Sequence, residues 1–370
     1  MIKIFTNDKK ANIICVEGDI KMNSPFNVSF GEEPKNLIKR TIEFEQVTSV
    51  FDSDMPETKI MMITGARGCG KTVLLSEVKN YYDNKDNWIT VDINPNGDIL
   101  AQLASKIYET GKVKKLFLKA EFNFSFHGLG LSIHGDESLS SIYTLLDNIF
   151  KYLKKKEIKV LITIDDVSCN DNVKLFVHSY QEYLREGYLT YLLLTGLYEN
   201  IDKLEKTDNI TFLARAPKIY LSKLNLRAIT MTYMSVFGIG EDDAIQLAKQ
   251  TNGYAYGFQL LGSILYKNNK TKIDDSILSN YDLQLEDNAY SLIWRSLTNL
   301  EQKILFGIAA TSGTNKEILN YTNLNNATLQ IYKIRLSKKG LIDSTQRGKI
   351  AFVLPRFKEF VLFQLKVMEE

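Results

Sequence analysis

The stretch Gly65-Ala-Arg-Gly-Cys-Gly-Lys71-Thr72 decides the fold of this chain. Its residues match the spacing G-x-x-x-x-G-K-[S/T] in full. An apolar run, residues 59–64, precedes the stretch, and residues 72–82 carry apolar side chains at helical spacing. A chance match to the bare pattern is the alternative, but both flanks are those that the motif needs. The sequence therefore predicts a strand, an anion-binding loop and a helix in succession.

The loop chemistry indicates a nucleotide with its metal ion. Glycines let successive backbone N–H groups turn inward around phosphate oxygens, and the helix N-terminus adds partial positive charge. Lys71 is expected to reach the β- and γ-phosphates, and the Thr72 hydroxyl to coordinate Mg²⁺. The predicted ATP-binding residues are Gly65, Ala66, Arg67, Gly68, Cys69, Gly70, Lys71, Thr72 and Val73.

A second acidic element is expected at the end of a later strand. Residues 159–166 read Lys-Val-Leu-Ile-Thr-Ile-Asp-Asp, an apolar strand that ends in two carboxylates, as in a Walker B motif. Asp165 is predicted to bind the metal, directly or through water, and Asp166 to act as base or to orient water. The alternative is a buried strand that merely ends in a turn.

Two further residues are candidates for catalytic roles. Thr195 ends the next apolar strand and could sense the γ-phosphate or its water, unless it is an ordinary strand-end residue. Arg215 lies just before a short strand and could reach a γ-phosphate in trans, or it could be a plain surface arginine.

Alternating strand and helix patterns predict an α/β fold. Apolar strands recur at residues 88–93, 159–164 and 190–196, with helical patterns between them. This alternation is typical of a parallel sheet covered by helices on both faces. Period-two alternation with a Gly-containing turn predicts an inserted hairpin at about 113–134.

The pattern of apolar and polar residues changes near residues 40, 220 and 295, which predicts four segments. Residues 1–40 form a lead-in, 41–220 an α/β ATPase domain, 221–295 a helical lid and 296–370 a final domain. A capping-box pair, Thr298 and Glu301, marks the last boundary.

The last segment has the pattern of a winged helix-turn-helix. Three helical stretches are followed by two short strands around a Gln-Arg-Gly turn and by a final helix. It holds eleven Lys or Arg against six Asp or Glu, a local net charge of +5. Ile331, Ile334 and Leu336 are expected in its core. Possible phosphate contacts are Lys333, Arg335, Lys338, Lys339, Arg347 and Lys349.

The overall amino-acid composition indicates a globular protein. The chain is 44% hydrophobic and 24% charged, with a net charge of +2 over 370 residues, which is typical of globular rather than disordered proteins. Its three cysteines have no CxxC spacing, and no apolar stretch approaches the roughly 20 residues of a membrane span. We expect a cytoplasmic protein with no membrane partner.

Five motifs in order resemble those of the AAA+ and STAND superfamily of P-loop ATPases, in particular bacterial ATP-binding proteins related to origin-recognition-type ATPases. Beyond the loop itself, the resemblance rests on SPFNVSFG near the start, FLARAP, TNGYAYGFQLLG, and IYKIRLSKKGLI with RGKIAFVLP. It spans roughly residues 24–370. It implies a P-loop NTPase fold of the AAA+ type, with a nucleotide between the α/β domain and the lid and an adenine pocket near residues 30–40.

The chain departs from the family pattern at several positions. Lys39-Arg40 stands where Gly-Arg is usual, and Ala255 replaces the proline of the lid motif. No arginine follows Gly253 in the expected lid helix, where a sensor arginine would sit in many AAA+ proteins, so Tyr254 or Tyr256 could pack on the nucleotide instead. Asp166 also stands where such ATPases often carry Glu. Slow turnover, as in a switch, is therefore expected rather than the action of a motor.

Two functions from different classes remain open. The first is an ATP-controlled switch that binds duplex DNA through its winged helix, with possible nucleotide-dependent self-association. The second is a STAND-like signalling or host-defence ATPase with protein partners, in which the winged helix packs on the nucleotide domain. Exposed lysines on the third helix favour DNA, whereas burial against the ATPase domain favours autoinhibition. A metabolic nucleotide kinase is disfavoured by the lid and the tail.

Overall fold

The computed structural model describes residues 24–29, 36–111, 113, 139–208, 210–346 and 348–369. The predicted hairpin insertion, apart from Val113, lies outside the described residues, as do Arg347 and most of the lead-in. Within the described part, no helix combines the length and apolar character needed to cross a bilayer.

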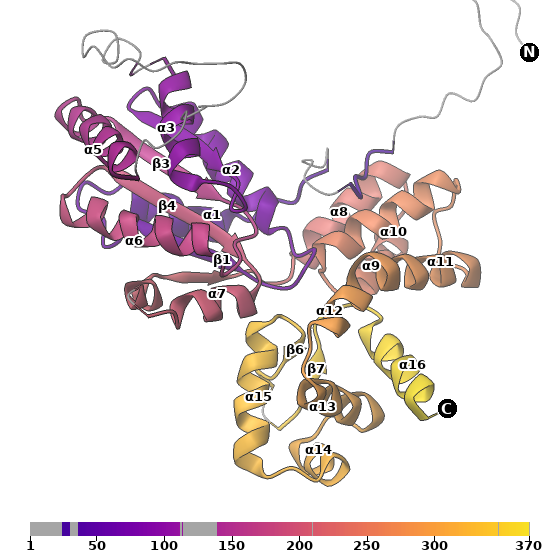
Figure 1. The fold of residues 1–370 in the computed structure, drawn as a ribbon. Coiled ribbons are helices and arrows are strands. Elements are labelled where there is room, and N and C mark those ends of the chain that lie inside the picture. Colours follow the sequence, from indigo (N-terminus) through magenta and orange to yellow (C-terminus); the bar gives the residue numbers. More distant parts are fainter. Residues whose placement is uncertain are drawn as a thin grey trace, which may run out of the picture.

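A five-stranded parallel sheet forms the centre of the first half of the chain, as predicted (Figure 1). Its order is β2-β3-β4-β1-β5. The strands are β1 (Ile60–Thr64), β2 (Trp88–Ile93), β3 (Lys159–Ile164), β4 (Thr190–Gly196) and β5 (Lys218–Tyr220).

Helices cover both faces of the sheet because successive strand residues point to opposite sides. In β1, Met61 and Ile63 pack with α1 and α2, whereas Ile60 and Met62 belong to the cluster with α3, α5, α6 and α7. These helices are α1 (Thr41–Phe51), α2 (Lys71–Asp83), α3 (Ile99–Glu109), α5 (Leu139–Lys155), α6 (Asp171–Arg185) and α7 (Tyr198–Glu205), and the short η1 (Thr211–Arg215) precedes β5.

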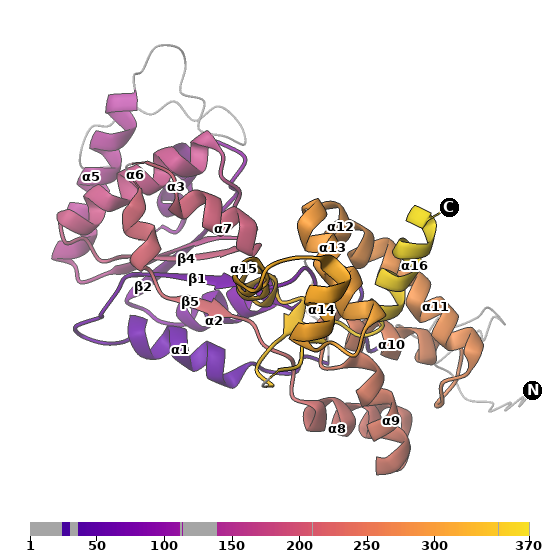
Figure 2. The ribbon, with the colours of Figure 1, turned by 90° about the horizontal axis from the view of Figure 1, so that it is seen from below.

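A helical region follows the sheet and lies beside it (Figure 2). Asn225 caps α8 through its side chain, which accepts from the backbone N–H groups of Arg227 and Ala228. The region comprises α8 (Leu226–Phe237), α9 (Glu241–Thr251), α10 (Ala255–Lys267), α11 (Asp275–Leu285), the π-helical η2 (Glu286–Tyr290) and α12 (Ser291–Arg295).

The C-terminal region begins at the predicted capping box, in which Thr298 and Glu301 bond reciprocally. It contains α13 (Asn299–Ala310), α14 (Asn315–Thr322), α15 (Asn326–Lys338), an antiparallel pair β6 (Ile342–Asp343) and β7 (Ala351–Phe352), and α16 (Phe357–Glu369). The expectation for α15 was partly wrong. Leu336 is buried, but Ile331 and Ile334 are 64% and 58% exposed.

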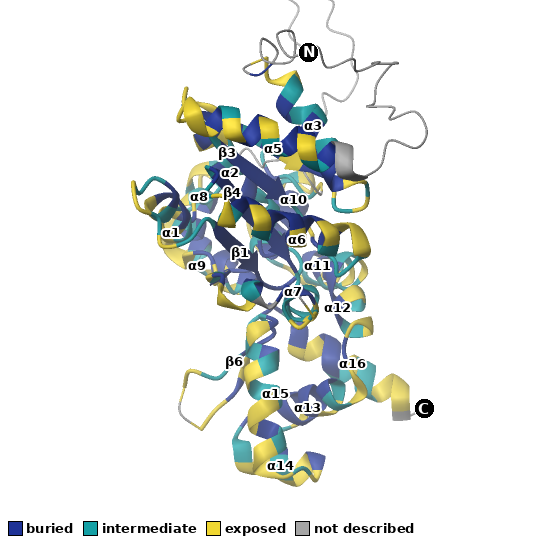
Figure 3. Ribbon diagram, turned by 60° about the vertical axis from the view of Figure 1, so that its left-hand side comes forward, coloured by how far each residue is buried: buried dark blue, intermediate teal, exposed yellow. Residues whose placement is uncertain are grey.

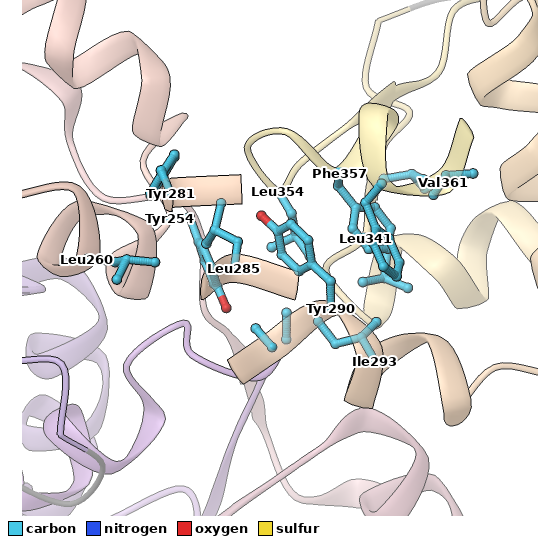
Figure 4. Close-up of a cluster of buried hydrophobic side chains, with 14 of the residues drawn as sticks. Tyr254, Leu260, Tyr281, Leu285, Tyr290, Ile293, Leu341, Leu354, Phe357 and Val361 are labelled. Atoms are coloured by element: carbon cyan, nitrogen blue, oxygen red, sulfur yellow. The ribbon is translucent and has the colours of Figure 1, made fainter. Parts of the chain in front are cut away.

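One hydrophobic cluster joins the helical region to the C-terminal region, and the predicted boundary at residue 296 runs through it. Tyr254, Tyr281 and Tyr290 meet Leu354 and Phe357 in this cluster (Figure 4). Buried residues of α10, α13 and α16 all belong to this cluster, and those of α13 appear in dark blue in Figure 3. An ion pair between Arg356 and Asp282 at 2.5 Å adds a polar connection between the two regions.

Candidate functional site

The glycine-rich loop turns tightly between β1 and α2. Gly68 and Gly70 have φ values of 74° and 95°, the left-handed region in which glycine carries no Cβ penalty. A Cβ at Gly68 would also collide with the hydroxyl of Tyr254. The predicted motif thus has the backbone geometry that an anion-binding loop requires.

Lys71 is the first residue of α2, and its ammonium group folds over the loop. It donates to the carbonyl oxygens of Gly65 at 3.2 Å and Ala66 at 3.0 Å. These acceptors are neutral, so a phosphate oxygen would compete well for the same ammonium group because charge-assisted hydrogen bonds are stronger.

The ends of β3 and β4 bring polar side chains to the start of α2. The Thr72 hydroxyl donates to Asp165 Oδ2 at 2.7 Å, and the Thr195 hydroxyl donates to Asp165 Oδ1. This follows from the register, because β3 pairs with β4 in parallel and their carboxyl ends meet at one edge of the sheet. The hydroxyls of two residues from separate segments therefore converge on one carboxylate.

Asp166 adopts φ of 50°, which is uncommon for a residue with a side chain. Its backbone N–H donates to Thr195 Oγ1 at 3.0 Å, which fixes the turn after β3. The residue itself is exposed. The Asp166 carboxylate thus lies next to Asp165 and is open to water, so it is suited to orient a water molecule.

A cavity of about 190 Å³ lies against the loop. Lead-in residues Val28 and Ile38 line one side, and Tyr256 and Phe258 of the lid line another, with the start of α2 between them. Of residues 30–40, where the adenine pocket is expected, Leu37, Ile38 and Arg40 line this cavity, and residues 30–35 lie outside the described part. Tyr256 lines this cavity, whereas Tyr254 is buried beneath the loop.

Two residues brace the loop in a way that motif matching did not reveal. The buried Arg40 donates to the carbonyl of Cys69 at 2.8 Å and pairs with Glu43 at 3.1 Å. The Tyr254 hydroxyl donates to the carbonyl of Arg67 at 2.7 Å. The sequence places Arg40 and Tyr254 within motifs that resemble those of the AAA+ and STAND superfamily. It gives no sign of their hydrogen bonds to the loop, because these bonds depend on tertiary packing.

The other predicted residues lie away from this carboxylate. Arg215 is exposed at the end of η1 and, among the described residues, makes no hydrogen bond or ion pair with the loop. Arg335 of α15 and Lys339, which directly follows this helix, pair with the buried Glu301 at 3.0 and 2.9 Å. Lys333 donates to Asn315 at 3.3 Å, and Lys338 lies over the ring of Tyr198. Lys349 is exposed.

The residues present fit Mg²⁺ and the phosphates of ATP. A hydroxyl and a carboxylate are oxygen ligands of the kind that Mg²⁺ prefers, and both already share a hydrogen bond. Phosphate oxygens would find three kinds of hydrogen-bond donor here: the backbone N–H groups of the loop, those of the first turn of α2, and the ammonium group of Lys71. When bound, the metal ion would neutralise phosphate charge.

Comparison with known families agrees with this geometry. Residues 44–193 match the KAP family P-loop domain, and residues 287–361 match a domain of unknown function, DUF8462. No curated protein matches the sequence.

Solved structures share the fold at low sequence identity. A Walker-type ATPase of Pyrococcus abyssi is 13% identical with a TM-score of 0.58, over 88% of this chain and 96% of its own. The ORC2 protein of Aeropyrum pernix, in ADPNP–ADP complexes, is 13% identical with a TM-score of 0.54, over 92% and 98%.

The fold and the family match together define the class: residues 44–193 match a P-loop NTPase domain, and the chain has the fold of the Walker-type ATPase and of ORC2. Its α/β part continues into a helical region, as in the structures that it resembles.

Proposed function

We propose that this protein is an ATP-binding, slowly hydrolysing switch whose C-terminal region, residues 296–369, docks on the glycine-rich loop. One observation carries the proposal. Gly340, just after α15, lies so close to the loop that an added Cβ would be 3.2 Å from the backbone nitrogen of Ala66. The C-terminal region therefore touches a residue whose carbonyl oxygen accepts from Lys71.

The switch works through Lys71. A phosphate that draws its ammonium group away removes the hydrogen bonds to Gly65 and Ala66. The loop at Gly65 and Ala66 then loses two bonds that hold it in place, and the contact between Ala66 and Gly340 of the C-terminal region changes. Two features fit slow turnover better than rapid cycling. Asp166 has a shorter side chain than the glutamate that often stands at this position, and the helix after Gly253 contains no arginine.

The contacts of α15 favour the signalling function, with a protein partner, over DNA binding. Arg335 and Lys339 are held by the buried Glu301, and Lys338 faces Tyr198 of the α/β domain. The exposed face carries Ile331 and Ile334 instead. Cations that are already paired contribute less to phosphate binding, because those pairs must first be broken.

Duplex DNA remains the second candidate because the C-terminal segment carries a net charge of +5 and Lys338 and Lys349 are exposed. Fluorescent duplex binding at two salt concentrations, with and without ATP and Mg²⁺, tests it. We expect no salt-sensitive binding. Binding that a Lys338→Glu, Lys349→Glu double variant abolishes would favour DNA instead. Point variants suit this test because truncation at residue 296 would open the shared core.

Two glycines provide a matched test of docking. Gly340 and Gly348 have φ values of 76° and 79°, so alanine is similarly strained at both, but nothing lies within 4 Å of a Cβ at Gly348. Because phosphate binding and docking oppose each other in this switch, we expect Gly340→Ala to slow the release of a fluorescent ADP analogue, and Gly348→Ala to leave it unchanged. Equal rates for both variants and the wild type would rule out docking as a restraint on the loop.

A further inference from the structure

A second cavity, of about 530 Å³, lies behind the glycine-rich loop, where three parts of the molecule meet. Ala66 and Cys69 form the loop wall, and Leu221, just after β5, continues it. Val353 and Leu354 of the C-terminal region line the opposite side. The volume lies within the range of about 300–1,000 Å³ that holds small organic ligands.

This cavity is separate from the metal-binding side of the loop. In the sheet, β1 lies between β4 and β5. Asp165 and Thr195 lie on the β4 side, whereas the cavity is lined by residues 220–223, which follow β5. Lys71 and Thr72 line the smaller cavity and are not among the lining residues here. Arg40 and Ala255 line both cavities, which therefore adjoin, but a nucleotide held by Lys71 and Thr72 leaves the walls at Leu221 and Val353 free.

The charges around the second cavity already have partners. Arg40 pairs with Glu43, and Lys223 donates to Asn252 Oδ1 at 2.9 Å. Asp343 accepts from the backbone N–H and the hydroxyl of Thr345 at 2.9 and 2.7 Å. The charges of Arg40, Lys223, Glu43 and Asp343 sum to zero, so the cavity favours neither an anion nor a cation, whereas an uncharged apolar ligand would bury its apolar walls.

We propose that the second cavity binds a small, uncharged and largely apolar organic molecule. Such a ligand touches the back of the loop at Ala66 and Cys69 and the C-terminal region at Val353 and Leu354. It strengthens the contact between the two parts because it buries apolar surface from both. This inference stands independently of the proposed switch, since it requires only the cavity and its walls.

The uncharged, solvatochromic dye Nile red is the probe. We expect saturable binding of one equivalent to the full-length protein, with a blue-shifted emission that persists in saturating ADP and Mg²⁺. Val353→Trp, which fills the cavity, should weaken the dye at least tenfold. Ile331→Trp is the matched control, because that side chain is 64% exposed on the same region, and it should bind as the wild type does.

Three results would overturn the proposal: no saturable binding to the wild type, displacement of the dye by ADP, or unchanged affinity in Val353→Trp. Thermal unfolding of each variant shows whether it is folded. Ser344→Trp fills the same cavity from another strand end and replaces Val353→Trp if that variant unfolds.

Discussion

The ammonium group of Lys71 contributes charge at the two carbonyl oxygens of the loop that a neutral side chain cannot replace. Lys71→Ala removes an ammonium group that makes two hydrogen bonds at the loop. Hydrogen bonds to charged groups contribute about 1.5–3 kcal/mol each, so ATP affinity should fall at least about 100-fold. Calorimetry with Mg²⁺ measures the loss. Wild-type affinity in the folded variant would remove the basis for assigning this loop to ATP.

Thr195 links the two acidic residues, since its hydroxyl donates to Asp165 and accepts from the backbone N–H of Asp166. Thr195→Val leaves the N–H of Asp166 without this acceptor and frees one oxygen of Asp165. We expect single-turnover hydrolysis to slow by about 10- to 100-fold, with ATP affinity nearly unchanged. Thr195→Ser, which keeps the hydroxyl, is the control. An equal loss in Thr195→Ser would show that the hydroxyl bonds do not account for the effect.

At the residue scale, the sequence predicted the chemistry of the loop better than its support. Lys71, Thr72 and Asp165 belong to local patterns whose spacing encodes their placement. Arg40 and Tyr254 act through bonds to carbonyls of distant loop residues. Nothing in one sequence states which arginine or tyrosine will make such a bond, because that depends on how the lead-in and the lid pack.

The α13 and α15 pair rests on a buried ion cluster. Burial opposes ionisation of Glu301, but the backbone N–H of Thr298 and the ammonium group of Lys339 outweigh it, so the pKa of Glu301 lies below its ordinary value. A carboxylate with a lowered pKa stabilises the fold at neutral pH, and this contribution disappears as the pH falls through its folded pKa.

Glu301→Gln should therefore lower the free energy of unfolding by about 3 kcal/mol at pH 7. This is the lower end for a broken buried pair, because the Arg335 side chain is 41% exposed. Chemical denaturation of variant and wild type from pH 7 down to about pH 4 measures the difference, which should shrink with acidity. A difference that stays constant or grows would contradict the ion-pair account.

At the element scale, hydrophobic periodicity predicted the sheet and its covering helices, because burial repeats every two residues in strands and every 3.6 in helices. The spacing of Thr298 and Glu301 predicted the capping box. It failed on the exposed side of α15. This helix has apolar residues all round, with Leu329 and Leu336 buried and Ile331 and Ile334 exposed. An apolar residue is assigned to the core by default, and only the packed structure reveals which face has no neighbour.

The whole molecule consists of an α/β part and a helical part that extends to the C-terminal region. The boundary inferred near residue 296 reflects a change of pattern, yet a single cluster crosses it, with Tyr290 on one side and Phe357 on the other. Sequence patterns reveal where helices begin and end. They do not reveal which helices share a core, because shared packing depends on long-range contacts.

This shared core gives nucleotide binding a route to the rest of the molecule. If the lid and the C-terminal region move together, a change at Ala66 alters the whole docked surface around Gly340. The central claim is therefore that nucleotide occupancy changes the protection of residues 337–345, although none of them lines the nucleotide cavity.

Hydrogen exchange at the backbone amides of residues 337–345 tests this claim most directly, in nucleotide-free protein, with ADP and with a non-hydrolysable ATP analogue plus Mg²⁺. We predict faster exchange with the analogue than without nucleotide, and no such change in Lys71→Ala. Identical exchange in all three states, with calorimetry showing that the analogue is bound, would contradict the account.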